Sequence, residues 1–284
     1  MTDPDPLHEL AAELRRHAEL TRYATQMNVL DAWTREIEKP RNADPKRLTR
    51  HGYKVYSQND EDGIIEEIFR RIGTGGGRTF VEFGVETGVE CNTAKLLVEG
   101  WRGLWIEADP ESAAAIRQNL APFIEGGRLT LAESVVTAEN IDALLVGGGM
   151  RGEIDLMSID IDYNDYWVWQ AVRAVEPRVV VIEYNATLRP PMSLVVPYEP
   201  GGRWDGSNYY GASLEALVRL GAQKKYRLVG CSFAGVNAFF VREDLCADRF
   251  LEPATAREHY EPPRHYLHLL PSGHRSRPGP FVAV

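Results

Sequence analysis

The amino-acid sequence predicts a doubly wound α/β fold. Short apolar segments alternate with segments of helical length from about residue 78 to residue 185. The run VVVI at 179–182 is continuously apolar, as in strands that are covered on both faces. Regular alternation of strand and helix implies a parallel sheet with helices on both of its faces.

Local sequence patterns predict where each helix and strand begins and ends. Apolar residues at three-to-four spacing predict an N-terminal helix at 7–38, which Lys39-Pro40 ends. A second helix at about 59–72 ends in the glycines that follow Ile72. The alternating region is then expected to contain strands at 78–84, 103–109, 128–134, 153–162 and 177–185 and helices at 90–99, 110–121, 138–146 and 165–175.

The pattern changes after residue 185. Residues 186–210 are rich in Pro, Gly and Tyr, and a loop of this length is usually functional or mobile. A helix is expected at 212–224, followed by two antiparallel strands and a loosely packed tail. The domains expected are an N-terminal helical extension at 1–50, a ligand-binding domain at 51–250 and a C-terminal tail at 251–284.

Composition excludes several classes of function. The formal net charge of -9 disfavours nucleic acid as a partner, because like charges repel. No apolar stretch is long enough for a membrane span, and the N-terminus lacks a signal-peptide pattern. Three cysteines without a CxxC pair fit a cytoplasmic protein. The apolar stripe of the N-terminal helix predicts either a cap over the active site or, as we favour, a homodimer contact.

The first motif is a glycine turn at the end of the first alternating strand. Gly84 and Gly88 permit a tight turn and let a ligand approach the backbone closely. The spacing is G-x-x-x-G, without the middle glycine of a dinucleotide phosphate site. Glu82 and Glu86 flank the turn, which is unfavourable beside pyrophosphate and suits a ligand with a cationic end.

The second motif is an acid about twenty residues further along. Glu107 stands at the tip of the next strand, where a carboxylate can accept hydrogen bonds from both hydroxyls of a ribose. The same reasoning applies to the ribose of NAD and to the ribose of adenosine ligands. Together the two motifs predict a nucleoside site at the carboxyl edge of the sheet.

These residues also carry a resemblance to a known family. VEFGVETG, NTAKLL and GWRGLWIEADP resemble class I S-adenosylmethionine-dependent methyltransferases, and YSQNDEDGIIEEIF is similar to the FkbM-type group. The resemblance spans about 56–245 and implies a Rossmann-like seven-stranded sheet of order 3-2-1-4-5-7-6 with the last strand antiparallel. It also implies S-adenosylmethionine as cofactor, with binding residues at Gln58, Glu82, Gly84, Gly88, Glu107, Ser134 and Asp160.

Acidic residues gather after the fourth and fifth strands. Asp160, Asp162 and Glu183 are expected at one edge of the sheet, where a divalent cation, the cationic groups of the cofactor or solvent would offset their charges. The layout is similar to metal-dependent O-methyltransferases of the catechol type, which implies Mg²⁺ held by Asp160 and Glu183. Tyr184 stands where that pattern has an amide, so Asn185 is the nearest candidate ligand. Asp160 and Asp162 are the predicted catalytic residues.

Aromatic residues predict where the acceptor binds. Tyr163, Trp204 and Tyr209 are candidate substrate-binding residues, since aromatic and polar side chains together suit a sugar or a phenol. Trp167 and Trp169 are expected to pack between helix and sheet instead. His51, His259 and His265 lie outside the motifs, so the sequence names no general base.

The leading hypothesis is an S-adenosylmethionine-dependent O-methyltransferase acting on a small polar acceptor. Three alternatives remain open: other chemistry in the same cofactor pocket, such as cyclisation or aminocarboxypropyl transfer; an NAD-dependent oxidoreductase, which the missing glycine disfavours; and a non-catalytic adenosyl-binding module.

Overall fold

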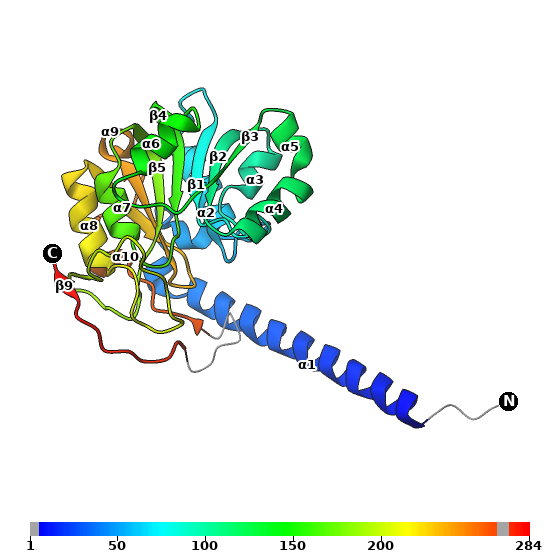
Figure 1. The fold of residues 1–284 in the computed structure, drawn as a ribbon. Helices are drawn as coiled ribbons and strands as arrows, with labels where there is room; N and C mark the ends of the chain where they lie inside the picture. The colour runs from blue at the N-terminus through cyan, green and yellow to red at the C-terminus, as the bar shows by residue number, and fades with distance from the viewer. Residues whose placement is uncertain (1–5, 266–272) are drawn as a thin grey trace. The chain divides into compact units, whose positions relative to one another are not determined.

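The computed structural model describes residues 6–265 and 273–284 (Figure 1). The chain forms two compact units that divide between Asp44 and Pro45, a few residues before the boundary expected at 50. The first unit contains α1 (Pro6–Ile37), the predicted N-terminal helix, and the short 3-10 helix η1 (Pro40–Asn42). None of the described helices is both long enough and apolar enough to cross a membrane.

The second unit is built on a seven-stranded sheet of order β3-β2-β1-β4-β5-β8-β7. The five strands β1 to β5 are mutually parallel, and β8 runs antiparallel to both of its neighbours. Because β6 belongs to a separate two-stranded sheet, β7 and β8 are the sixth and seventh strands of the expected numbering, so the expected order is confirmed. The strands are β1 (Thr79–Phe83), β2 (Arg102–Glu107), β3 (Leu129–Glu133), β4 (Gly152–Ile159), β5 (Val175–Glu183), β7 (Tyr226–Cys231) and β8 (Asn237–Arg242).

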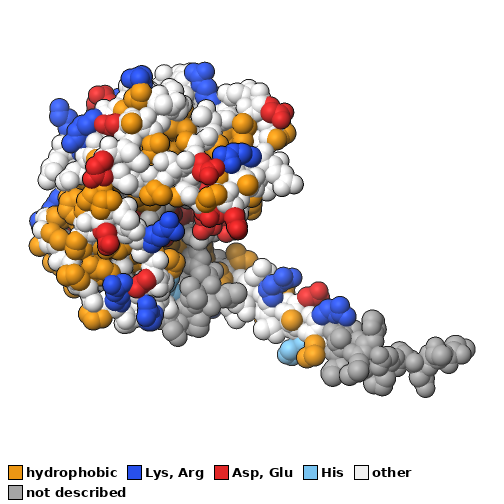
Figure 2. Space-filling view, in the orientation of Figure 1, with side chains coloured by type: hydrophobic (Ala, Val, Ile, Leu, Met, Phe, Trp, Pro, Cys, Tyr) orange, Lys and Arg blue, Asp and Glu red, His pale blue; other side chains and the backbone are white. Residues whose placement is uncertain are grey.

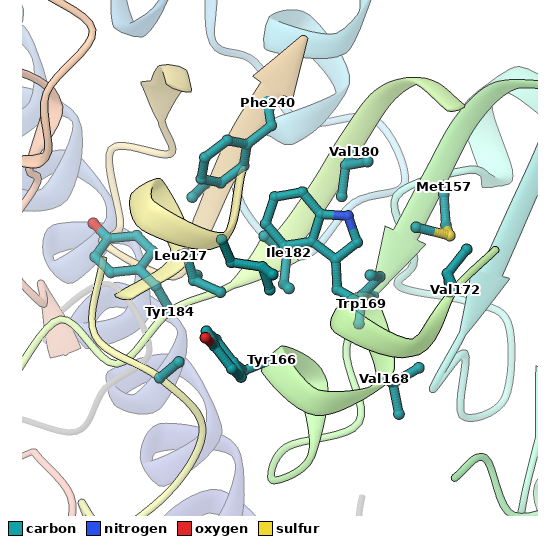
Figure 3. Close-up of a cluster of buried hydrophobic side chains, with 14 of the residues drawn as sticks. Met157, Tyr166, Val168, Trp169, Val172, Val180, Ile182, Tyr184, Leu217 and Phe240 are labelled. Carbon is teal, nitrogen blue, oxygen red and sulfur yellow. The ribbon is translucent and has the colours of Figure 1, made fainter. Parts of the chain in front are cut away.

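Helices cover both faces of this sheet and create two apolar cores. Alternate residues of β1 face opposite sides: Phe80 packs with residues of α2, α3 and α4, whereas Val81 packs with residues of α6, α7 and α8. Trp169 is almost fully buried in the second core, with its ring centroid 5.0 Å from that of Phe240 (Figure 3). Its predicted packing role is therefore confirmed. The helices are η2 (Leu48–His51), α2 (Glu61–Ile72), α3 (Ala94–Val98), α4 (Pro110–Asn119), α5 (Ala121–Glu125), α6 (Ile141–Gly147), α7 (Asp165–Ala171), α8 (Leu214–Gln223), α9 (Glu243–Cys246) and α10 (Ala256–His259).

Two helices are shorter than their sequence patterns predict, and side-chain hydrogen bonds explain both. α3 begins at Ala94 instead of residue 90, because the preceding backbone N–H groups of Asn92 and Thr93 donate to the carboxylate of Glu82. α7 ends at Ala171 instead of residue 175. The backbone N–H groups of 173 and 174 donate to Asp142 Oδ1, both at 2.8 Å, which turns the chain into β5.

The C-terminal segment is packed more tightly than its aperiodic sequence predicts. His259, Glu261 and Arg264 are buried, and Arg264 Nη1 lies 3.0 Å from Glu261 Oε2. The last strand, β9 (Val282–Ala283), pairs antiparallel with β6 (Leu194–Val195) inside the long loop. The expectation of loose packing is therefore wrong for residues 251–265, whereas the side chains of 273–284 are half-buried or exposed.

An ion-pair network on α2 gives a testable contribution to stability. Glu67 is buried and accepts hydrogen bonds from Arg70 Nε at 2.5 Å and Arg71 Nε at 2.7 Å. Arg71 also donates to the backbone carbonyl of Lys46 at 2.7 Å, so the network links α2 to the segment before η2. The hydrogen bond from Arg70, and those from Arg71, lower the pKa of Glu67 to about 2.

We expect Glu67→Gln to lower the free energy of unfolding by about 1–2 kcal/mol at pH 7, since hydrogen bonds to charged groups are lost. Because the folded-state pKa is depressed, this stabilisation is full above the unfolded pKa near 4.5 and disappears as the pH falls through about 2. Urea unfolding of both proteins at pH 7 and pH 3 tests this. The exposed Glu125→Gln is the control, and equal stability of parent and Glu67→Gln at pH 7 would contradict the assignment.

Candidate functional site

A cavity of about 520 Å³ opens at the carboxyl ends of β1, β2, β4 and β5. Ligands of doubly wound folds bind at this edge, and the volume is that of an ordinary small-molecule site. Acidic side chains also gather near the centre of the molecular face seen in Figure 2. The carboxylates that line the cavity are Glu82, Glu86, Glu90, Glu107, Asp160, Asp162 and Glu183. None of its described lining residues is Lys or Arg.

Gly84 forms the floor of the cavity at the point where β1 and β4 end side by side. Its φ of +80° favours glycine, and a Cβ built there would lie 1.5 Å from the carbonyl oxygen of Asp160. Gly84 therefore lines the cavity, as predicted. Gly88 does not line the cavity. A Cβ built at Gly88 would lie 2.7 Å from the ring of Trp105, so the structure corrects the role of Gly88 from ligand contact to close packing.

Glu82 joins the floor of the cavity to the turn that precedes α3. Its carboxylate accepts hydrogen bonds from the backbone N–H groups of Asn92 at 2.8 Å and Thr93 at 2.9 Å, and from the Thr93 hydroxyl at 2.6 Å. Burial raises the pKa of this carboxyl, although these donors oppose the shift. Glu82 thus holds the turn around the cavity while it contributes to the lining.

Glu107 lies at the tip of β2 and faces the same cavity. Its two oxygens accept separate backbone hydrogen bonds, from Glu86 at 2.7 Å and from Asp109 at 2.8 Å. Each carboxylate oxygen still has a lone pair for a ligand hydroxyl. Ser134 lines the cavity beyond the neighbouring strand, and Gln58 lines it from the segment before α2. Ser57 is fully buried beneath Gln58, where its hydroxyl contacts Asp62 at 3.0 Å.

Three carboxylates at the ends of β4 and β5 form a cluster that can hold a cation. Asp160, Asp162 and Glu183 each offer one oxygen, and these oxygens lie within 4.8 Å of one another. Burial and the neighbouring negative charges raise the pKa values of Asp160 and Glu183 well above their usual range. Glu183 Oε2 is buried and has no hydrogen-bond partner among the described residues. A donor set made only of oxygen, with one buried atom unsatisfied, fits Mg²⁺ or a similar hard cation.

The structure corrects the assignment of Asn185 to this cluster. Its Nδ2 donates to the backbone carbonyls of Asn208 at 2.9 Å and Tyr210 at 3.0 Å, and its Oδ1 accepts from the backbone and hydroxyl of Thr187. All its polar atoms are therefore engaged in holding the long loop, and Asn185 does not line the cavity. Tyr184 is also buried, and its hydroxyl donates to the carbonyl of Glu261 at 2.6 Å.

Of the three aromatic residues predicted to bind substrate, only Trp204 lines the cavity. Tyr163 and Tyr209 are buried against each other, with ring centroids 6.4 Å apart, and Tyr209 packs edge-on against Phe281 at 4.9 Å. The structure corrects their role from substrate contact to core packing beneath the loop. Trp204 keeps 38% of its surface exposed and lies beside Tyr210, which also faces the cavity.

Several cavity residues were missed by sequence reasoning. His274 packs edge-on against Trp204 with ring centroids 4.9 Å apart, and His265 packs against His274 at 5.0 Å. Both histidines line the cavity, so the view of His265 as a residue outside the site is wrong. Asn237 lines the cavity from the start of β8. No local motif marks any of these three residues, because long-range packing brings them to the site.

Comparisons with known proteins give similarity only at the level of fold. No family model and no curated protein matches the chain. The glycopeptide N-methyltransferase MtfA complexed with sinefungin is 16% identical over 66% of this chain and 89% of its own, with a TM-score of 0.40. The N-terminal domain of EvdMO1, in the presence of SAH and D-fucose, is 12% identical over 73% and 94%, with a TM-score of 0.41.

The pyocyanin biosynthetic protein PhzM is 17% identical over 63% of this chain, with a TM-score of 0.38. The chain spans about half the length of PhzM, 54%. At such identities the function of this chain has to be inferred from its own residues.

Proposed function

We propose that this chain is an S-adenosylmethionine-dependent O-methyltransferase that acts on a hydroxyl of a small polar acceptor, such as a sugar or a secondary metabolite. The observation that carries the proposal is the charge of the cavity: seven carboxylates line it, and no Lys or Arg does among the described residues. Such a lining repels the pyrophosphate of NAD and attracts a ligand with sulfonium and ammonium groups. The glycine turn and the family resemblance of the surrounding motifs support the same ligand.

Each residue of the proposed cofactor site has a separate role. Glu107 accepts the ribose hydroxyls through the lone pairs that its two backbone hydrogen bonds leave available. Gly84 lets the ligand approach the backbone closely. Burial raises the pKa of Glu82 and Asp160, and the cationic end of the ligand would favour their ionised forms. Ser134 and Gln58 border the adenosine. The S-adenosyl sulfonium, when bound, supplies an activated methyl group.

We propose that Asp160, Asp162 and Glu183 hold Mg²⁺. A divalent cation held there would supply Lewis-acid chemistry, which lowers the pKa of an acceptor hydroxyl. The three carboxylates would hold the cation at the ends of β4 and β5, and positioning of the acceptor supplies much of the rate in a transfer that must occur in line. His265 is a candidate proton acceptor, because burial lowers its pKa and keeps the imidazole neutral at pH 7.

The acceptor is proposed to bind against Trp204, Tyr210 and His274. We expect Trp204→Ala to raise the KM for the acceptor by about tenfold or more, since an exposed indole face contributes roughly 1–2 kcal/mol to stacking. Affinity for S-adenosylhomocysteine should stay within a few-fold, because Trp204 belongs to the long loop and is not one of the proposed cofactor-binding residues. Steady-state kinetics and calorimetry measure the two effects. Tyr198→Phe, in the same loop but outside the cavity lining, is the control, and lost cofactor affinity in Trp204→Ala counts against the assignment.

One set of experiments separates this function from its alternatives. Calorimetry should detect binding of S-adenosylhomocysteine and none of NAD. Incubation with methyl-labelled S-adenosylmethionine and a panel of hydroxylated acceptors should transfer label and release S-adenosylhomocysteine. Methylthioadenosine as the product would instead indicate aminocarboxypropyl transfer, and binding without turnover of any acceptor would favour a non-catalytic module. Transfer that continues in excess chelator would remove Mg²⁺ from the proposal.

We also propose that α1 mediates a homodimer. Leu20, Tyr23, Met27 and Leu30 follow a three-to-four spacing along the helix, and all four side chains are exposed. Sedimentation velocity is expected to give twice the chain mass of 31.9 kDa, and a double variant Leu20→Glu, Met27→Glu is expected to sediment as a monomer. A parent protein that sediments as a monomer at every concentration tested would refute this.

A further inference from the structure

Asn237 lies on the strand next to β5, beside Glu183 of the carboxylate cluster. It is the first residue of β8, and the antiparallel pairing of β5 with β8 places it opposite Glu183. Side chains of directly opposed residues point to the same face, with Cβ atoms about 4.5–5.5 Å apart. Asn237 lines the cavity, although only 3% of its surface is exposed. The pairing therefore brings an amide to the side of Glu183.

The orientation of this amide is fixed by its neighbours. Nδ2 of Asn237 donates to Glu61 Oε1 at 3.1 Å, and Glu61, itself fully buried, is held by the backbone N–H of Asn59 at 2.8 Å. The carboxyl oxygens of Glu61 are the acceptors in both of these hydrogen bonds, so the nitrogen of the amide faces Glu61 and the oxygen faces away from it. A flipped amide would place two acceptors against each other.

The oxygen of the Asn237 amide therefore lacks a hydrogen-bond donor in the part of the chain that the structure describes. Asn237 Oδ1 and Glu183 Oε2 are both buried, and neither has a hydrogen-bond partner within residues 6–265 and 273–284. Buried polar atoms without partners are uncommon and costly, at about 1–3 kcal/mol each. Two unpartnered acceptors on opposed residues, both in the lining of one cavity, can be satisfied by a cation or by a hydrogen-bond donor placed between them. Amide and carboxylate oxygens are also the ligands that hard divalent cations take in proteins.

We propose that Asn237 Oδ1 is a fourth protein ligand of a divalent cation held by Asp160, Asp162 and Glu183. The inference rests on the cation of the proposed function and adds to it the amide that Asn185 cannot supply. Glu61 is then a positioning residue, which orients the ligating amide through its hydrogen bond. A neutral fourth ligand also lets the site bind a cation without a fourth adjacent negative charge.

The test is calorimetric titration of Mg²⁺ and Mn²⁺ into the full chain without methyl donor. We expect Asn237→Ala to weaken cation binding at least tenfold, because a ligand is removed. Asn92→Ala is the matched control: Asn92 lines the same cavity, but its amide donates to Ser158 at 3.0 Å, and its cation affinity should equal that of the parent. Thermal unfolding in chelator shows whether each variant is folded.

A double variant distinguishes ligation from general damage to the site. Asn237→Asp combined with Glu61→Gln exchanges the amide and the carboxylate, so that the hydrogen bond between them persists and an oxygen still faces the cation. This double variant should recover affinity to within a few-fold of the parent, whereas affinity that stays as low as in Asn237→Ala would contradict ligation by the side chain at this position.

Three results would overturn the inference. Unchanged cation affinity in Asn237→Ala would mean that Oδ1 has another partner, such as a protonated Glu183. If Asn237→Ala loses affinity for S-adenosylhomocysteine in chelator while its cation affinity is unchanged, Asn237 Oδ1 would be assigned to the ammonium group of the methyl donor. A parent chain that binds no cation would also reject it, and binding of S-adenosylhomocysteine by that same protein would leave the proposed transferase standing.

Discussion

Glu107→Ala is expected to reduce affinity for S-adenosylhomocysteine by about 100-fold, because two hydrogen bonds from ribose hydroxyls to a charged acceptor are lost, each worth roughly 1.5 kcal/mol or more. The carboxylate is well placed for this role, since one backbone N–H holds each of its oxygens and the side chain has little freedom to lose on binding. Calorimetry of the parent and the variant measures the difference directly.

Glu133→Ala is the matched control for this experiment. Glu133 is the register partner of Glu107 on β3, so the two acids stand side by side at the same edge of the sheet. Glu133 pairs with Arg117 at 2.7 Å and does not line the cavity, and its removal should leave affinity within about twofold of the parent, as for most surface substitutions. Full affinity in Glu107→Ala would refute the nucleoside site as a whole.

Gly84→Ala is expected to lower the free energy of unfolding by more than about 3 kcal/mol and to abolish ligand binding. A positive φ costs an L-residue roughly 1–2 kcal/mol on its own. At Gly84 the added Cβ would also lie 1.5 Å from the carbonyl oxygen of Asp160, so β1 and β4 must separate to admit it. That separation would break the hydrogen bond from the Asp160 backbone to Phe83, which measures 3.2 Å, and would displace the carboxylate cluster.

Gly100→Ala isolates the backbone contribution to this effect. Gly100 has a φ of +91°, and a Cβ added there would meet no heavy atom within 4 Å, so it carries the conformational penalty without the contact. We expect it to cost about 1–2 kcal/mol and to bind S-adenosylhomocysteine normally. Urea unfolding of the two variants side by side gives the cost of the contact by difference. Equal stability of the two would show that the strands tolerate the extra methyl group.

Local patterns were sufficient to predict the elements that carry the floor of the site. The strands β1 to β5 follow from apolar runs bounded by turn residues, and parallel strands must end at one edge of the sheet. Glu82, Glu107, Asp160 and Glu183 each stand at such an end, and all four line one cavity. Their convergence was therefore predictable without any knowledge of side-chain contacts.

The residues that failed to follow prediction depend on contacts distant in sequence. Asn185 is next to the site along the chain, but the long loop takes up every polar atom of its amide. Asn237 is far away along the chain and reaches the site through antiparallel pairing with β5. Tyr163 and Tyr209 carry the right chemistry, but they fill a small core under the loop, where composition does not distinguish packing from binding.

The concentration of negative charge around the cavity has a consequence for the catalytic cycle. Transfer of the methyl group converts a sulfonium into an uncharged thioether, so the spent molecule loses part of the electrostatic attraction that drew in its precursor. The pocket should consequently bind S-adenosylmethionine more tightly than S-adenosylhomocysteine, which limits inhibition by the product. Since mobile ions screen such attraction, that preference should shrink as ionic strength rises. The contribution of the cavity carboxylates Glu82, Asp160 and Glu183 should be screened least, because they lie deepest in the cavity.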